Sequence, residues 1–341
     1  MMHTKKVTVY GTLGPACGDP ETLKAMFREG MDGVRLNLSH TTLDEAAELI
    51  GRCRRAAGEC GVSPEFLIDM QGPELRIGRL REPIRLAAGE RIGMDAIPFP
   101  DAVRKALAGN SSGQEILLDD GKLLLKAEAP EAGHGVWLRV IRGGLLEGGK
   151  SAALPGRRID TPAMTAGDRA QIRKAKEYGV TAVMQPFVRS REDLIEVRSA
   201  LDASGCQDIR LFAKIENTAG IEHIRDLIPY CDEIVIARGD LGNAMELWEL
   251  PAAQKRIAAV CRKAGRDFMV VTQMLDSMAH RQVPTRAEVS DIFNAVLDGA
   301  ASVMVTGETA AGEYPALAIR YLSRTVREAE AYLARPAAEQ E

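Results

Sequence analysis

The stretch LFAKIEN, residues 211–217, is the part of the sequence that best distinguishes between the possible folds of this chain. It is an apolar run that ends in a positive and a negative side chain two residues apart. Alternate side chains of a β-strand share a face, so Lys214 and Glu216 would lie together while Ile215 faces the other way. Such a pair is either a solvated ion pair on an edge strand, which stabilises little, or a functional pair at the end of a buried strand.

On both sides of this stretch, short β-branched runs alternate with longer amphipathic segments. Helices are expected at residues 168–178, 192–201, 251–263 and 286–297 and after Tyr314, and Asp19 with Pro20 gives an N-cap and first-turn proline for an earlier helix. The eight strand runs are KVTVYGTLG, GVRLNLSH, EFLIDMQG, TAVMQPFV, IRLFAKIEN, EIVIARGD, DFMVVTQM and SVMVTGE. Eight strand-then-helix units predict a closed α/β (β/α)8 barrel, or TIM barrel, because an open doubly wound sheet usually has fewer strands.

The alternation breaks within residues 75–153. This segment contains short strand-like runs punctuated by glycines, and DDGK stands at a hairpin position. We therefore expect a small β-rich lid domain inserted after the third strand. The expected domains are residues 1–74 and 154–332 for the barrel, 75–153 for the lid and 333–341 for a tail.

Composition excludes several classes of protein. The chain has 341 residues, 45% of them hydrophobic and 27% charged, with a formal net charge of −4, which argues against a nucleic-acid or anionic-membrane partner. The six cysteines form no C-x-x-C pair and are expected to be reduced thiols. A secretory h-region and an apolar run of membrane-spanning length are both absent, so a cytoplasmic location is expected.

Polar residues follow nearly every predicted strand. The active site of a barrel lies at the carboxyl ends of its strands, so these residues would converge on one rim. This convergence favours a functional role for the pair in LFAKIEN. The residues at the strand ends are Arg35, Asn37, Ser39, His40, Asp69, Lys214, Glu216, Arg238, Asp240, Thr272, Gln273, Thr306 and Glu308.

Four of these residues predict the chemistry. Glu216 and Asp240 are carboxylates from neighbouring strands that could hold one Mg2+, and Arg35 and Lys214 are cations suited to a phosphoryl group. A metal beside fixed cations is typical of phosphoryl transfer or enolate stabilisation. The alternative for the two carboxylates is a salt-bridge network with Lys214 and Arg238.

The sequence RGDLG adds backbone donors. Gly239 and Asp240 are expected in a turn before the next helix, and a helix N-terminus favours a carboxylate group. The sequence therefore predicts a substrate that carries both a carboxylate and a phosphate.

Along nearly all of the barrel the chain resembles the pyruvate kinase family. The matching stretches are VRLNLSH, LIDMQGPELRIG, ILLDDGKLLLK, LPGRRIDTPAMTAGD, AKIENTAGI, IVIARGDLG, VTQMLDSM, PTRAEVSDIFNAVLDGA and VTGETAAGEYP. The resemblance implies phosphoryl transfer from phosphoenolpyruvate to ADP, which gives ATP and a metal-stabilised pyruvate enolate that is then protonated on carbon.

The resemblance also implies roles for individual residues. Glu216 and Asp240 would hold Mg2+ or Mn2+, Lys214 would neutralise charge on the phosphoryl group and the enolate, and Arg35 would bind the phosphate. The implied catalytic residues are Lys214, Arg35, Thr272, Thr306 and Glu308, and the implied substrate-binding residues are Arg35, Lys214, Gly239, Asp240 and Thr272.

Further residues match cation and nucleotide positions of the family. Asn37, Ser39, Asp69 and the backbone carbonyl of Met70 would bind K+, and Glu74 matches the residue type of potassium-dependent members. The residues that would face ADP or ATP are His40, Arg76 and Lys150, with Asp120 on the lid. For His40, a capping or packing role is an equal alternative.

The chain departs from the family pattern near the substrate. Met70 and Gln71 stand in place of a Thr-Lys pair, Pro186 stands in place of a serine, and Thr306 replaces another serine. Two alternatives to the kinase follow. One is an enolate enzyme of the same barrel type that acts on a 2-oxo acid or uses another phosphoryl acceptor, and the other is a non-catalytic sensor of phosphoenolpyruvate.

The stretch ARPAAEQE follows the eighth barrel helix, where the family has a C-terminal α/β domain with a sugar-phosphate effector site and a subunit interface. The resemblance therefore leads us to expect no activation by fructose 1,6-bisphosphate. A homodimer through the barrel faces is the expected assembly.

Overall fold

The computed structural model describes residues 6–108, 111–119, 121–129, 135–157, 159 and 161–335. Within these residues, eight parallel strands close into a barrel in the order β1-β15-β14-β13-β12-β11-β3-β2. The predicted TIM barrel is confirmed. Its strands are β1 (Thr8–Thr12), β2 (Gly33–Asn37), β3 (Glu65–Asp69), β11 (Ala182–Gln185), β12 (Arg210–Ile215), β13 (Glu233–Ala237), β14 (Asp267–Val271) and β15 (Ser302–Val305).

Side chains of alternate residues fill the barrel. The middle of the interior is apolar and almost completely buried, formed by Tyr10, Leu67, Ala182, Met184, Phe212, Val235, Ala237, Met269, Val271 and Met304. Strand alternation then places Arg35, Asp69 and Lys214 on the inward face near the carboxyl ends of their strands. The barrel is thus a packed core with polar side chains at its ends.

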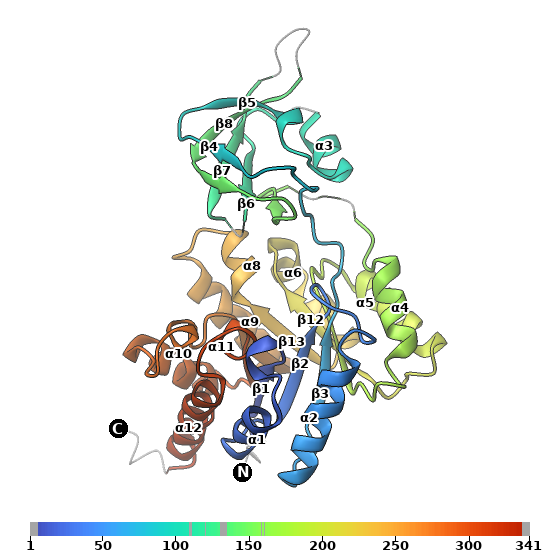
Figure 1. Cartoon of the computed structure of the whole chain (residues 1–341), viewed down its shortest axis with the longest axis vertical. Helices are drawn as coiled ribbons and strands as arrows, with labels where there is room; N and C mark the ends of the chain where they lie inside the picture. Colours follow the sequence, from blue (N-terminus) through green and yellow to red (C-terminus); the bar gives the residue numbers. More distant parts are fainter. Residues whose placement is uncertain are drawn as a thin grey trace. The chain divides into compact units, whose positions relative to one another are not determined.

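Helices surround the strands of the barrel (Figure 1). Asp19 caps the first helix by accepting a hydrogen bond from the Thr22 amide, and Pro20 is its first residue, as predicted. The longer helices are α1 (Pro20–Arg28), α2 (Ala47–Glu59), α4 (Ala166–Lys174), α5 (Arg191–Ala203), α9 (Leu250–Ala264), α10 (Arg286–Leu297) and α12 (Pro315–Leu333). Shorter helices follow three of the strands: α6 (Thr218–Glu222) and then α7 (Ile224–Leu227) after β12, α8 (Arg238–Asn243) after β13, and α11 (Gly307–Ala310) after β15.

The segment inserted after β3 is mostly antiparallel β-structure, as predicted. A five-stranded sheet has the order β10-β6-β7-β8-β5, and β4 pairs with β9. Its elements are β4 (Ile84–Leu86), β5 (Arg91–Gly93), α3 (Asp101–Ala108), β6 (Glu115–Leu118), β7 (Leu123–Ala127), β8 (Trp137–Arg142), β9 (Gly144–Leu146) and β10 (Ala152–Ala153). The helix α3 was not singled out by the sequence pattern. It packs Val103 and Leu107 into the core of this unit.

The chain divides into two compact units. The barrel unit contains Met1–Gly72, Ala163–Arg238 and Pro251–Glu341, and the inserted unit contains Pro73–Pro162 together with Gly239–Leu250. The sequence pattern put the lid at 75–153. A proline stands at three of the four boundaries, where its fixed φ and missing N–H interrupt regular structure. Within the described part of the chain, no helix combines the length and apolarity that a membrane span needs.

Candidate active site

Four charged side chains form a buried series at the carboxyl end of the barrel. Arg35 donates from Nε (3.0 Å) and Nη2 (2.6 Å) to Asp69 Oδ2. Lys214 Nζ lies 3.3 Å from the same oxygen and 2.8 Å from Glu216 Oε1. The predicted sharing of one face by Lys214 and Glu216 is therefore confirmed. The solvated edge-pair interpretation is wrong, because β12 is an inner strand of a closed barrel and Glu216 is only 3% exposed.

Burial and opposite charge act against each other in this series. Burial alone would raise the pKa of Asp69, but Lys214 and Arg35 outweigh it, so that the pKa of this carboxyl is lowered. Burial alone would lower the pKa of Lys214, and the carboxylates of Asp69 and Glu216 outweigh it, so that this pKa is raised. At neutral pH Lys214 is therefore a fixed cation, suited to stabilising negative charge and not to giving up a proton.

The turn after β11 holds the second oxygen of Glu216. The amide of Phe187 donates to Glu216 Oε2 at 2.8 Å, and Phe187 has a positive φ of 54°. Backbone in this region is strained for a non-glycine residue. The carboxylate is thus fixed by Lys214 on one oxygen and by a backbone amide on the other.

Asp240 and Gly239 lie in the short helix α8 directly after β13. The turn predicted here is wrong, since residues Arg238–Asn243 continue from the strand as a helix. Asp240 is exposed, whereas Glu216 is buried. Both residues are carboxylates. Mg2+ usually binds to one or two protein carboxylates and keeps water and substrate oxygens as its other ligands. In residues 6–335, apart from the gaps, no group of three or more acidic, histidine or cysteine side chains could hold a metal.

Arg238 shapes the turn that carries Thr272. Its guanidinium donates to the Thr272 carbonyl from Nε (3.1 Å) and Nη2 (2.7 Å) and pairs with Asp291 at 2.5 Å. Thr272 and Gln273 both have positive φ, 79° and 54°. The alternative for Glu216 and Asp240 was a salt-bridge network with Lys214 and Arg238. Of this network, the pair of Glu216 with Lys214 is found, whereas Arg238 pairs with Asp291.

Glu308 joins the ends of β14 and β15. Its Oε2 accepts from the amide (2.7 Å) and the hydroxyl (3.3 Å) of Thr306, and its Oε1 accepts from the Leu275 amide at 3.1 Å. Glu308 is only 3% exposed. The structure therefore places the carboxylate of Glu308 as a link between two loops, with the Thr306 hydroxyl beside it.

The residues predicted for K+ come from two neighbouring strand ends. The register pairs Asn37 with Asp69, and the Leu38 amide donates to the Asp69 carbonyl at 2.9 Å. Asn37 Oδ1 accepts from the Ser39 amide at 3.1 Å. Amide, hydroxyl and carbonyl oxygens are the ligands that replace water around K+, and Met70 follows Asp69 directly. The Asp69 carboxylate itself is bonded to Arg35 and Lys214.

The residues predicted to face the nucleotide lie in both units. In the barrel unit His40 is exposed, and its amide donates to the Asn37 carbonyl at 3.4 Å. In the inserted unit Arg76 pairs with Glu74 at 2.9 Å, and Lys150 pairs with Asp119 at 3.2 Å and with Glu147 at 3.2 Å. Asp120, predicted on the lid, lies outside the described residues.

Two polar residues near the site were missed by the sequence reasoning. Thr12 Oγ1 accepts from Arg35 Nη1 at 3.3 Å and donates to the Val305 carbonyl at 3.0 Å. Asp168 accepts from the amides of Gln71 (3.0 Å) and Gly72 (3.1 Å) in the loop after β3. The signal for Asp168 was a Thr-x-x-acid capping pattern at the start of α4, but this pattern does not reveal contacts with another loop.

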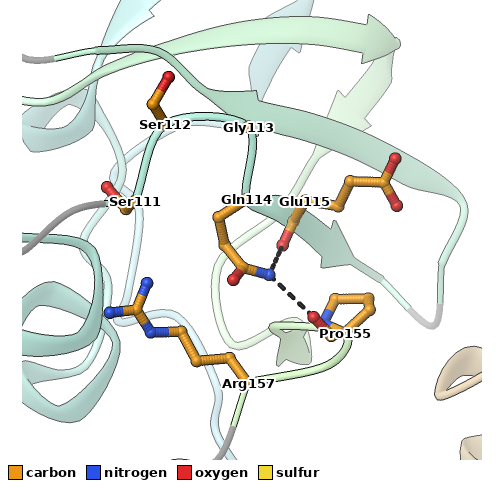
Figure 2. Close-up of a pocket in the computed structure, with 7 residues that line it drawn as sticks. All are labelled: Ser111, Ser112, Gly113, Gln114, Glu115, Pro155 and Arg157. Atoms are coloured by element: carbon orange, nitrogen blue, oxygen red, sulfur yellow. Dashed lines mark hydrogen bonds between the residues drawn. The ribbon is translucent and has the colours of Figure 1, made fainter.

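A polar pocket of ≈ 360 Å³ lies on the inserted unit (Figure 2). Within it the side-chain amide of Gln114 donates to the carbonyls of Glu115 (3.0 Å) and Pro155 (2.9 Å). The lining residues are Ser111, Ser112, Gly113, Gln114, Glu115, Pro155 and Arg157. None of them is among the residues predicted for substrate, metal or nucleotide, so the candidate site is not built from this pocket.

The closed barrel and the buried cations at the carboxyl ends of its strands together define a (β/α)8 enzyme equipped to stabilise anions. Residues 4–319 match the pyruvate kinase barrel domain. The chain belongs to the pyruvate kinase family, a family of phosphotransferases.

Proteins named pyruvate kinase are similar to nearly the whole chain. A protein of Agrobacterium vitis is 35% identical over 340 residues, which cover 96% of this chain and 69% of that protein. A protein of Mycobacterium tuberculosis is 36% identical, and this chain covers 70% of the length of that protein. One of Geobacillus stearothermophilus is 34% identical, and the chain spans only 55% of its length.

Proposed function

We propose that this protein transfers the phosphoryl group of phosphoenolpyruvate to ADP, giving ATP and pyruvate. The observation that carries the proposal is the buried series Arg35–Asp69–Lys214–Glu216, which holds two cations and two carboxylates in fixed positions at one end of the barrel. The similarity to proteins named pyruvate kinase supports the choice of substrates.

In the proposed reaction the bond between phosphorus and the enol oxygen breaks while a bond from phosphorus to an ADP oxygen forms. The electron pair stays on the enol oxygen, and carbon 3 of the enolate then takes up one proton. Arg35 holds the phosphoryl group, and Lys214 stabilises the charge shared between that group and the enolate oxygen. Because the raised pKa of Lys214 keeps it protonated, the proton for carbon comes by way of the hydroxyls of Thr272 and Thr306.

The proposed cofactors are Mg2+, or Mn2+, and K+. Glu216 and Asp240 would hold the divalent ion, whose chemistry is to neutralise charge on phosphoryl and enolate oxygens. Asn37, Ser39, Asp69 and Met70 would hold K+, with Glu74 as the residue type of potassium-dependent relatives. The Gly239 amide would bind the substrate carboxylate, and His40, Arg76, Lys150 and Asp120 would face the nucleotide.

The test follows purified protein by phosphorus NMR with phosphoenolpyruvate, ADP, Mg2+ and either K+ or Na+. We expect ATP to appear, faster in K+. If no ATP forms in either salt, exchange of pyruvate methyl protons in deuterated water separates the alternatives. Metal-dependent exchange would favour an enolate enzyme with another acceptor. Stabilisation by phosphoenolpyruvate and Mg2+ without any turnover would favour a sensor.

Three finer expectations stay predictions. These are the absence of activation by fructose 1,6-bisphosphate, assembly as a homodimer through barrel faces, and a cytoplasmic location. A phosphoenolpyruvate saturation curve with and without the sugar phosphate tests the first, and light scattering tests the second.

A further inference from the structure

Asp168 is a buried carboxylate that the proposed reaction does not use. It lies in the first turn of α4, is 2% exposed, and accepts four hydrogen bonds. Two come from Thr165, whose amide (2.8 Å) and hydroxyl (2.7 Å) form a capping box. The other two come from the Gln71 and Gly72 amides, about a hundred residues earlier in the chain, at 3.0 and 3.1 Å. Helix capping explains the first two bonds only.

The bond to the Gln71 amide fixes the direction of a neighbouring carbonyl. The N–H of Gln71 and the C=O of Met70 belong to one peptide group, which is planar and trans, so the two point in opposite directions. Asp168 Oδ1 holds this N–H at 3.0 Å. The carbonyl of Met70 therefore points away from α4.

The peptide on the other side of Met70 is also held. The Met70 amide donates to the Met184 carbonyl of β11 at 3.1 Å. One step further on, Gly72 has a φ of +62°, and a Cβ there would lie 2.3 Å from Pro186 Cγ. Met70 is thus held by β11, and Gln71 and Gly72 are held by Asp168, before the chain leaves the barrel unit at Gly72. Pro186 leaves no room for a side chain at Gly72.

We infer that Asp168 is a positioning residue for the monovalent-cation site, because it aims the Met70 carbonyl at the ion. The inference rests on the proposed function, in which that carbonyl is a K+ ligand. Groups that orient metal ligands typically contribute 10- to 100-fold to metal affinity. Asp168 accordingly sets the K+ concentration that the enzyme needs, and it leaves the rate at saturating K+ largely intact.

The first test compares Asp168→Asn with the wild type at saturating phosphoenolpyruvate and ADP. Asparagine keeps the shape and one acceptor oxygen but weakens the bonds to the two amides. We expect the K+ concentration for half-maximal rate to rise about 10- to 100-fold, while the maximal rate changes by less than about threefold. An unchanged K+ requirement in a folded variant overturns the inference, and so does an equal loss of rate at every K+ concentration.

Glu288→Gln is the matched control. Glu288 forms the same capping box with Thr285 at the start of α10, and its other oxygen accepts from the Ser277 amide at 2.7 Å. It has no bond to the loop after β3 in the described structure. A similar rise in the K+ requirement in this variant would overturn the inference, because loss of any capping box would then suffice.

A second measurement uses the wild-type protein, in case Asp168→Asn does not fold. Hydrogen exchange of the Gln71 amide should slow when K+ replaces tetramethylammonium, since the ion would hold the other end of the same peptide group. If the activity needs K+ but the exchange rate of the Gln71 amide is the same with and without K+, the proposed role of the Met70–Gln71 peptide is overturned. A wild-type rate that does not respond to K+ at all overturns the cation site itself, so the two failures are distinguishable.

Discussion

Lys214 Nζ lies 2.8 Å from Glu216 Oε1, and the side chains of the two residues are only 15% and 1% exposed. The pair is part of a series in which the charges of Arg35 and Lys214 balance those of Asp69 and Glu216. A buried charge whose partner is removed typically costs about 3–5 kcal/mol. The stability of this end of the barrel and its chemistry therefore depend on the same four side chains.

Lys214→Met should reduce the rate of ATP formation by about 10^3-fold or more, since it removes a fixed cation from the transferring phosphoryl group. It should also lower stability, because Glu216 loses its charged partner. Steady-state kinetics and urea unfolding measure the two effects. Lys255→Met is the control, since Lys255 also forms an ion pair, with Asp298 at 2.6 Å, but is 56% exposed. Turnover within about tenfold of wild type in Lys214→Met would contradict the assigned role.

Arg35→Lys should be damaging although it conserves the charge. The guanidinium donates from two nitrogens to Asp69 and from the third to Thr12, and a lysine ammonium cannot reproduce this planar arrangement. We expect the KM for phosphoenolpyruvate to rise and kcat/KM to fall by about 10- to 100-fold, equivalent to about 1.4–2.8 kcal/mol. Full activity in Arg35→Lys would show that charge alone is sufficient at this position.

Much of the fold and part of the site follow from local sequence. Strand alternation alone places Lys214 and Glu216 on one face, and eight strand-then-helix units require a barrel. The meeting of Asp69 with Lys214 could not be predicted in the same way, because it depends on the register of β3, β11 and β12 across 145 residues of chain. The bonds of Asp168 to the loop after β3 depend equally on tertiary packing.

The helix α8 shows a different limit of sequence reasoning. RGDLG contains two glycines, which favour a turn, yet residues Arg238–Asn243 are helical. Helix propensity is a weak guide for so short a segment, and the packing around it can override it. Gly242, for example, has Leu250 and Leu247 within van der Waals distance of where a Cβ would be.

Gly72→Ala should destabilise the barrel unit by about 1–3 kcal/mol. An alanine would have to adopt a φ of +62° and would place its Cβ 2.3 Å from Pro186 Cγ. Urea unfolding of Gly72→Ala, Pro186→Ala and the double variant separates the two causes. We expect the double variant to be more stable than the sum of the single effects predicts, since Pro186→Ala relieves the steric part and leaves the backbone part. Strictly additive effects would mean that only the backbone matters.

Glu233, at the opposite end of the barrel, makes the stability of the folded state depend on pH. It is 3% exposed, pairs with Arg210 at 2.9 Å and accepts a short hydrogen bond from Ser302. Burial, with Asp267 and Glu65 nearby, outweighs Arg210 and Ser302 and raises the pKa of Glu233 from 4.5 to about 7. Between these two values the folded state holds a proton that the unfolded state has lost, so stability falls as pH rises through this range.

Glu233→Gln should remove this dependence. The free energy of unfolding of the wild type relative to the variant should fall by up to about 3 kcal/mol between pH 5 and pH 8, and it should level off above pH 8. Urea unfolding of both proteins at intervals across this range makes the comparison. Glu313→Gln serves as the control, since Glu313 is exposed and pairs with the equally exposed His280. A constant difference between wild type and Glu233→Gln at every pH would mean that Glu233 stays ionised in the folded barrel, held by Arg210 in spite of its burial.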